Sequence, residues 1–176
     1  MSEPALFEVP RQSLSRDLDV VVDPDLPIDA AVASAFWSRV IKSSSCWYWT
    51  GAISSPDGYG RINWRRRGRQ RTLSAQRFAM LLMIPELADG QVCEHHCNQP
   101  LCVRVDPEHL LVGTQASNLA YAAAIGRAQG PRVTALHTRV GRSLAIRDYL
   151  VRGGDSDQIG SVDLEAAVDQ LPLWSL

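Results

Sequence analysis

One span in the second half of the chain gathers side chains that could bind a metal ion, transfer a proton or begin a helix. It consists of Glu94-His95-His96-Cys97, Cys102, Asp106-Pro107-Glu108-His109-Leu110, Gly113-Thr114 and Asn118. Thiolate and imidazole groups are the usual ligands of zinc in proteins. An imidazole can also act as a general base near neutral pH. Because a hydrophobic core needs none of these groups, the span predicts a functional site.

The ligand types in this span favour a structural zinc site. Cys97, Cys102 and His109 supply three ligands, and a closed tetrahedral site needs a fourth. The fourth ligand could be Cys93, which is close in sequence, or Cys46, which is far away. Because the loop has few other groups to hold it, zinc would contribute directly to folding. In a chain without a secretory leader, cysteines act more often as ligands or free thiols than as disulfides.

Positive charge is concentrated in one stretch, although the 176-residue chain has a formal net charge of only -1. The stretch from Gly58 to Pro85 contains no acidic residue, whereas both ends of the chain are acidic. Its basic residues are Arg61, Arg65, Arg66, Arg67, Arg69, Arg71 and Arg77. Guanidinium groups match phosphate oxygens, and phosphate binding releases condensed counterions. The stretch therefore predicts nucleic-acid binding. The alternative is a solvated arginine-rich loop, against which the missing acidic partners argue.

Helical spacing and strand alternation predict the elements that would present this stretch. We expect a helix capped by Asp29 and continuing to about Ile41, a strand over 46–50, a turn over 54–58, a strand over 59–65 and a helix over 74–83. The two strands would form a hairpin. Arg61, Asn63 and Arg65 would share one face, and Ile62 and Trp64 the other. Such a hairpin could lie against a groove of DNA.

The span with the cysteines and histidines is predicted to fold as strand, loop, strand and helix. The strands cover 91–95 and 109–112, and Thr114 caps the helix that follows. Asn118 would lie one turn into this helix, where its side chain can face the strand that carries His95. The positive end of the helix dipole would also favour a nearby phosphate group.

The chain is expected to divide into three parts. An acidic, proline-broken leader over 1–27 is expected to be disordered, a folded domain covers 28–130, and a helical extension covers 131–176. Within the extension, helices are expected over 133–152 and from Ser161. No apolar run approaches the ~20 residues that are needed to cross a bilayer, and no secretory leader is present. These features predict a cytoplasmic protein with no membrane partner.

Taken together, the motifs resemble the HNH endonucleases of the ββα-metal superfamily. They are most similar to the His-Cys box homing endonucleases and to phage HNH proteins. The resemblance covers about residues 36–130 and includes Cys46-Trp47-Tyr48-Trp49-Thr50-Gly51 and Gly58-Tyr59-Gly60-Arg61-Ile62. It implies an α+β fold with a ββα-metal core, an N-terminal antiparallel β-hairpin region and C-terminal helices. The structural zinc ligands that it implies are Cys46, Cys97, Cys102 and His109, which favours Cys46 over Cys93.

The resemblance also implies roles in hydrolysis of double-stranded DNA. His95 matches the general base, Asn118 matches the ligand of a catalytic Mg²⁺ ion, and Arg61 matches the residue that holds the phosphate near the cut. Magnesium prefers oxygen ligands and stabilises a leaving oxygen, so this set suits a one-metal mechanism that leaves 5′-phosphate and 3′-hydroxyl ends. The expected DNA contacts are Arg61, Asn63, Arg65, Arg66, Arg67, Arg69 and Arg71. The resemblance also implies a bacterial cell or a phage-infected host cell as the location.

Other functions are compatible with the same motifs. A catalytically silent, zinc-containing DNA-binding protein derived from such a nuclease would keep the zinc ligands and the basic stretch. A zinc domain that binds protein would need only the ligands. Two features depart from the family: Gln76 stands where many relatives carry His, and Val103-Arg104-Val105 lengthens the loop before His109. A double-strand break requires two active sites, which a homodimer or sequential nicking would supply.

Overall fold

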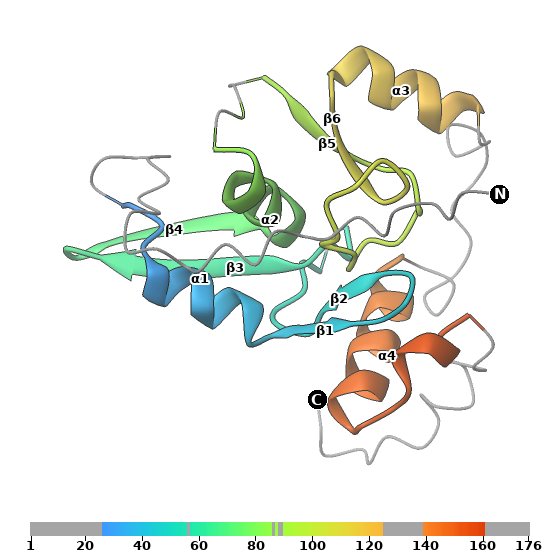
Figure 1. Cartoon of the computed structure of the whole chain (residues 1–176), viewed down its shortest axis with the longest axis horizontal. Coiled ribbons are helices and arrows are strands. Elements are labelled where there is room, and N and C mark those ends of the chain that lie inside the picture. The colour runs from blue at the N-terminus through green and yellow to red at the C-terminus, as the bar shows by residue number, and fades with distance from the viewer. Residues whose placement is uncertain (1–25, 56, 86, 88–89, 125–138, 161–176) are drawn as a thin grey trace, which may run out of the picture.

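The computed structural model describes residues 26–55, 57–85, 87, 90–124 and 139–160 (Figure 1). This part of the chain is α+β, as expected, with small antiparallel hairpins and four α-helices. The elements are α1 (Ala30–Trp37), β1 (Val40–Lys42), β2 (Trp47–Trp49), β3 (Arg61–Arg66), β4 (Arg69–Ser74), α2 (Ala75–Met83), β5 (Val92–His95), β6 (Leu110–Gly113), α3 (Gln115–Ala124), α4 (Arg139–Val151) and a short 3₁₀ helix (Ser156–Gln158). The predicted leader up to residue 25, the start of the helix over 133–152 and the helix from Ser161 lie outside the described residues.

The first helix begins where it was predicted but ends earlier. The Asp29 side chain accepts a hydrogen bond from the Val32 amide at 2.9 Å and so caps α1. The chain leaves the helix at Trp37, and the predicted end at about Ile41 is therefore wrong. Instead, β1 forms three antiparallel pairs with β2. β-Branched side chains such as Val40 suit a strand, and pairing with a distant segment overrides the helical spacing.

The predicted hairpin between 46–50 and 59–65 does not form. β2 pairs with β1, and β3 pairs with β4 across a two-residue turn at Arg67-Gly68. Both turn residues have positive φ angles, 49° and 75°, as the tight turns of β-hairpins require. This local turn lets β3 find its partner immediately downstream. The start of the second predicted strand instead pairs with residues 52–54, just beyond the first, through the bridge from Ile53 to Gly60 and a hydrogen bond from the Arg61 amide to the Ala52 carbonyl.

Strand β2 lies between two hydrophobic clusters and sends alternate side chains to each. Trp49 is fully buried in the first cluster, where its ring stacks on Phe36 with centroids 5.0 Å apart. Tyr48 enters the second cluster, together with Ile146 and Leu150 of α4. In Figure 1, α4 accordingly lies beside β1 and β2. Helix α4 is therefore packed against the rest of the described domain.

Strands β5 and β6 and helix α3 follow one another in the predicted order. The hairpin pairs Val92 with Gly113 and His95 with Leu110. The Thr114 hydroxyl accepts a hydrogen bond from the Ser117 amide at 3.1 Å, which confirms Thr114 as the cap of α3. None of the helices in the described ranges is long and apolar enough to span a bilayer.

Candidate metal centre

Four side chains from separate segments converge on one point. The Sγ atoms of Cys46, Cys97 and Cys102 and a ring nitrogen of His109 all lie within 4.8 Å of one another. His109 Nδ1 lies 3.6 Å from Sγ of Cys46 and 3.6 Å from Sγ of Cys102. A tetrahedral zinc ion with Zn–S bonds of about 2.3 Å and Zn–N bonds of about 2.1 Å needs S···N separations of about 3.6 Å. The cluster can therefore hold a metal ion, and its donor atoms and spacing suit zinc.

Backbone pairing brings Cys102 to Cys46, a ligand from a distant part of the chain. The Trp49 amide donates to the Leu101 carbonyl at 2.8 Å, and the Val103 amide donates to the Trp47 carbonyl at 2.8 Å. The loop thus runs antiparallel along the free edge of β2, with Cys102 opposite Tyr48. This pairing places Cys102 beside the start of β2, where Cys46 lies. The lengthened loop at 103–105 is therefore part of the edge pairing that assembles the cluster.

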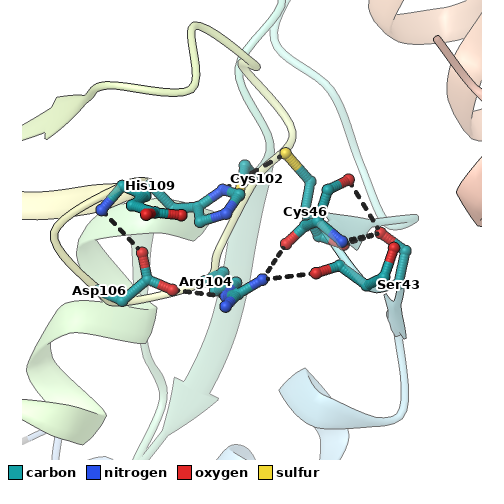
Figure 2. Close-up of polar contacts among 9 residues, drawn as sticks. Ser43, Cys46, Cys102, Arg104, Asp106 and His109 are labelled. Atoms are coloured by element: carbon teal, nitrogen blue, oxygen red, sulfur yellow. Dashed lines mark hydrogen bonds and ion pairs between the residues drawn. The ribbon is translucent and has the colours of Figure 1, made fainter. Parts of the chain in front are cut away.

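Arg104 clamps the two sides of the cluster together. Its guanidinium donates to the carbonyls of Ser44 and Ser45, just before Cys46. The same group forms an ion pair with Asp106, whose carbonyl accepts a hydrogen bond from the His109 amide. Figure 2 shows Arg104 between Asp106 and the Ser43 segment, below the cysteines and the histidine. The sequence predicts only that Arg104 lengthens the loop, because the Ser44 and Ser45 carbonyls come from a distant part of the chain.

Without a cation, the three clustered thiols cannot all ionise easily, as the shifts in their pKa values show. Hydrogen bonds from Cys102 and then Cys46 hold the pKa of Cys97 well below its usual range. The hydrogen bonds with Cys46 and Cys97, together with burial, raise the pKa of Cys102. For Cys46, a hydrogen bond from Cys102 lowers the pKa, but Cys97 and burial outweigh it and raise the pKa to about 12. Only one thiolate is easily accommodated, so a bound dication would be needed to ionise all three.

Cys93, the other candidate for the fourth ligand, lies outside the cluster. It is half-buried on β5 and packs against the first hydrophobic cluster. Burial raises the pKa of its thiol to about 11. Cys93 therefore behaves as a small core residue.

His95 lies at the end of β5, directly before the metal cluster. Its ring is 6% exposed, and neither ring nitrogen has a hydrogen-bond partner among the described residues. The ring contacts Tyr59, with centroids 5.6 Å apart. The imidazole lies close enough to Cys97 to contribute to the lowered pKa of that thiol. A buried imidazole whose ring nitrogens have no hydrogen-bond partner among the described residues is unusual and calls for an explanation.

Helix α3 contacts the opposite face of β5. Ser117 lies within hydrogen-bond reach of the buried Glu94 carboxylate, and Tyr121 stacks on His96 with ring centroids 4.5 Å apart. Glu94 fills the space above Gly113, where a Cβ atom would overlap the carboxylate. Strand alternation places Glu94 and His96 on the face away from His95. The sequence placed Glu94 in the functional span but assigned it no role of its own.

The predicted catalytic residues are not gathered in the way that the metal ligands are. Asn118 is half-buried on α3 next to Ser117, and its backbone amide donates a hydrogen bond to the Thr114 carbonyl. No hydrogen bond or ion pair among the described residues joins Asn118 to His95 or Arg61. Arg61 instead forms an ion pair with Asp57, at 2.8 Å.

The predicted DNA-binding residues divide between the two faces of the β3–β4 hairpin. The outer face carries Arg61, Asn63 and Arg65, as expected from alternation, while Ile62 and Trp64 are buried. In the observed register, Arg69 pairs with Arg66, and Arg71 pairs with Trp64. Because directly paired residues share a face, Arg66, Arg69 and Arg71 lie on the same face as Trp64. Arg66 forms a double ion pair with Asp29, far outside the basic stretch. Acidic partners that were missing from the local sequence are thus supplied from elsewhere. Arg67 is exposed at the turn.

Comparison with known proteins gives no match to a protein family, a curated protein or a solved structure. Relatives therefore provide no functional information for this chain. What supports a function is the set of residues and their geometry: a Cys₃His cluster, a buried histidine beside it and an arginine-rich hairpin.

Proposed function

We propose that the protein is a zinc-stabilised, magnesium-dependent DNA endonuclease of the HNH type. The observation that carries the proposal is the position of His95, buried without a hydrogen-bond partner among the described residues and two residues before a zinc-type ligand, Cys97. A structural metal ion held by Cys97 would fix the end of β5 and thereby the position of the imidazole. Because no described residue occupies the ring nitrogens, a water molecule can donate a hydrogen bond to one of them.

In the proposed reaction, His95 takes the proton of the water molecule that attacks a DNA phosphate. Asn118 would bind the magnesium ion, which stabilises the charge on the leaving 3′ oxygen when it is present. Glu94 adds buried carboxyl oxygens between β5 and α3, next to the turn of α3 that carries Asn118, and oxygen atoms are the ligands that magnesium prefers. The expected products carry 5′-phosphate and 3′-hydroxyl ends.

The β3–β4 hairpin is the proposed contact with double-stranded DNA. Its outer face presents Arg65 and Asn63 to solvent, and Arg67 extends the positive charge to the turn. A two-stranded ribbon fits the width of the major groove, and arginine can bind phosphates or guanine edges. Such contacts predict an affinity that falls steeply with salt.

One observation favours the second candidate, a catalytically silent zinc-containing DNA-binding protein. α3 meets β5 and the residue after it through Ser117 and Tyr121, and no hydrogen bond among the described residues joins Asn118 to His95. Arg61 is held by Asp57 rather than left available for a phosphate. A protein that only binds DNA would need no such assembly.

Cleavage of supercoiled plasmid separates the two candidates. We expect nicked or linear product from the purified protein with magnesium, none with EDTA, and a loss of about 100-fold or more for His95→Ala. His96→Ala is the matched control, because it removes the neighbouring imidazole from the other face of β5. A plasmid that is bound but never cut, or one cut equally well by His95→Ala, would contradict the proposed nuclease mechanism.

A further inference from the structure

The first residue of α4 lies next to the side chain that packs on His95. The Arg139 guanidinium lies over the Tyr59 ring, 5.4 Å from its centroid. Tyr59 in turn contacts the His95 ring, with centroids 5.6 Å apart. Arg139 is exposed, whereas His95 is buried. The three side chains therefore form a continuous row from the surface to the candidate base.

The start of α4 is held in this place by close packing on both sides. A Cβ atom at Gly58 would lie 2.8 Å from the Arg139 carbonyl oxygen, so only glycine leaves room for the helix here. One turn further along, Ser143 is 1% exposed, and Ile146 is fully buried in the second cluster. Arg139 therefore starts from an anchored backbone.

Arg139 differs from Arg61, the arginine that the family resemblance places at the cut. The Arg61 guanidinium is neutralised by Asp57 at 2.8 Å and also reaches Ser54. Arg139 has no acidic partner in the described part of the chain, and its guanidinium stacks on an aromatic ring instead. Stacking orients the planar group while leaving its N–H donors available to an anion.

We propose that α4 completes the DNA-binding site and that Arg139 holds a DNA phosphate beside His95. This inference rests on the proposed function and extends it to the C-terminal helix. The ligand is a backbone phosphate of double-stranded DNA, which the guanidinium would bind through two N–H donors. Tyr59 acts as a positioning residue, because it sets the distance between the cation and the imidazole. Charge neutralisation at the phosphate would speed attack by the water that His95 deprotonates.

Two measurements test the role of Arg139, each on the full chain. In a single-turnover plasmid assay at saturating protein, Arg139→Ala should lower the cleavage rate by about 100-fold. A His95→Ala background prevents cutting and allows binding to be measured. In this background, affinity for a short duplex should fall less steeply with salt after Arg139→Ala, with the magnitude of the slope of log affinity against log salt reduced by about 0.9. Arg139→Lys should restore the slope but not the full rate, because a point charge lacks the planar fork.

Arg152→Ala is the matched control, since it removes an equal charge from an exposed position just beyond the other end of α4. An Arg139→Ala variant that matches this control in both rate and salt slope would overturn the inference and leave the nuclease proposal intact. If the unsubstituted protein binds DNA without cutting it, a lowered slope still supports the phosphate contact while the nuclease proposal fails. Failure to bind DNA at all would overturn both.

Discussion

The four metal-ligand residues and the three predicted catalytic residues come from overlapping parts of the chain, yet the fold arranges them differently. Cys46, Cys97, Cys102 and His109 converge within 4.8 Å, and strand pairing along β2 together with the Arg104 clamp holds their segments in place. By contrast, the predicted catalytic residues each pack against separate neighbours. The metal site is thus organised by the backbone in advance, whereas a catalytic arrangement would need the substrate or its metal ion to draw the groups together.

The strongest test of this contrast removes one metal ligand. Cys102→Ser should lower the free energy of unfolding of the zinc-loaded protein by about 4 kcal/mol or more, because it removes a fully buried ligand. Urea unfolding followed by tryptophan fluorescence would measure the change. Cys93→Ser is the control, because it makes the same chemical change outside the cluster. Equal losses for the two variants would mean that no metal stabilises the fold.

The pH dependence of zinc affinity tests the protonation of the cluster. Without metal, the pKa of Cys46 is raised to about 12 and that of Cys102 is also raised, so both thiols carry protons at pH 7 to 8. Zinc binds thiolates and must displace these two protons. Raising the pH from 7 to 8 should therefore strengthen the affinity by about 100-fold, or about 2.7 kcal/mol. Chelator competition would show this, and a change of about tenfold or less would mean that at most one proton leaves.

A smaller effect is expected at the clamp. Arg104→Ala should weaken zinc affinity by about 10-fold, because the residue positions the ligand-bearing segments without touching the ion. Arg147→Ala is the control, since it also breaks an arginine–aspartate ion pair, on α4. Zinc affinity after metal removal and reloading measures the difference. An affinity equal to that of the control variant would mean that strand pairing alone organises the cluster.

The smallest effect is expected at Arg61. Asp57→Asn keeps an oxygen for the Tyr59 amide but releases the Arg61 guanidinium. Because the ion pair is partly exposed, its loss should cost less than about 1 kcal/mol of stability. The freed cation should raise DNA affinity about threefold at low salt. Asp148→Asn removes an equal charge from α4 as a control. No gain over that control in a filter-binding assay would show that Arg61 does not reach DNA.

The sequence predicted the parts of the fold that depend on neighbouring residues. Asp29 and Thr114 cap helices, and Ile62 and Trp64 are buried while the residues between them are not. These outcomes follow from local hydrogen bonds and from strand alternation. The zinc ligands were likewise recognisable from their types, although choosing Cys46 over Cys93 required the family resemblance.

Features that depend on distant pairing could not be predicted in the same way. β1 forms because β2 offers an edge, and the loop at 101–103 joins the other edge of β2. The ion pair between Arg66 and Asp29 links residues 37 positions apart. In each case the partner lies beyond any local window, and tertiary contacts decide the outcome. The contact of Tyr59 with His95, and that of Arg139 with Tyr59, could not be recognised for the same reason.

Zinc K-edge X-ray absorption on the purified protein tests the central claim most directly, namely that the Cys₃His cluster holds a structural zinc ion. We expect about one zinc per chain, with three sulfur neighbours at about 2.3 Å and one nitrogen neighbour at about 2.1 Å. The sulfur count should fall to two in Cys102→Ser and stay at three in Cys93→Ser. Absence of bound zinc, or a shell of oxygen and nitrogen atoms without sulfur, would contradict the claim.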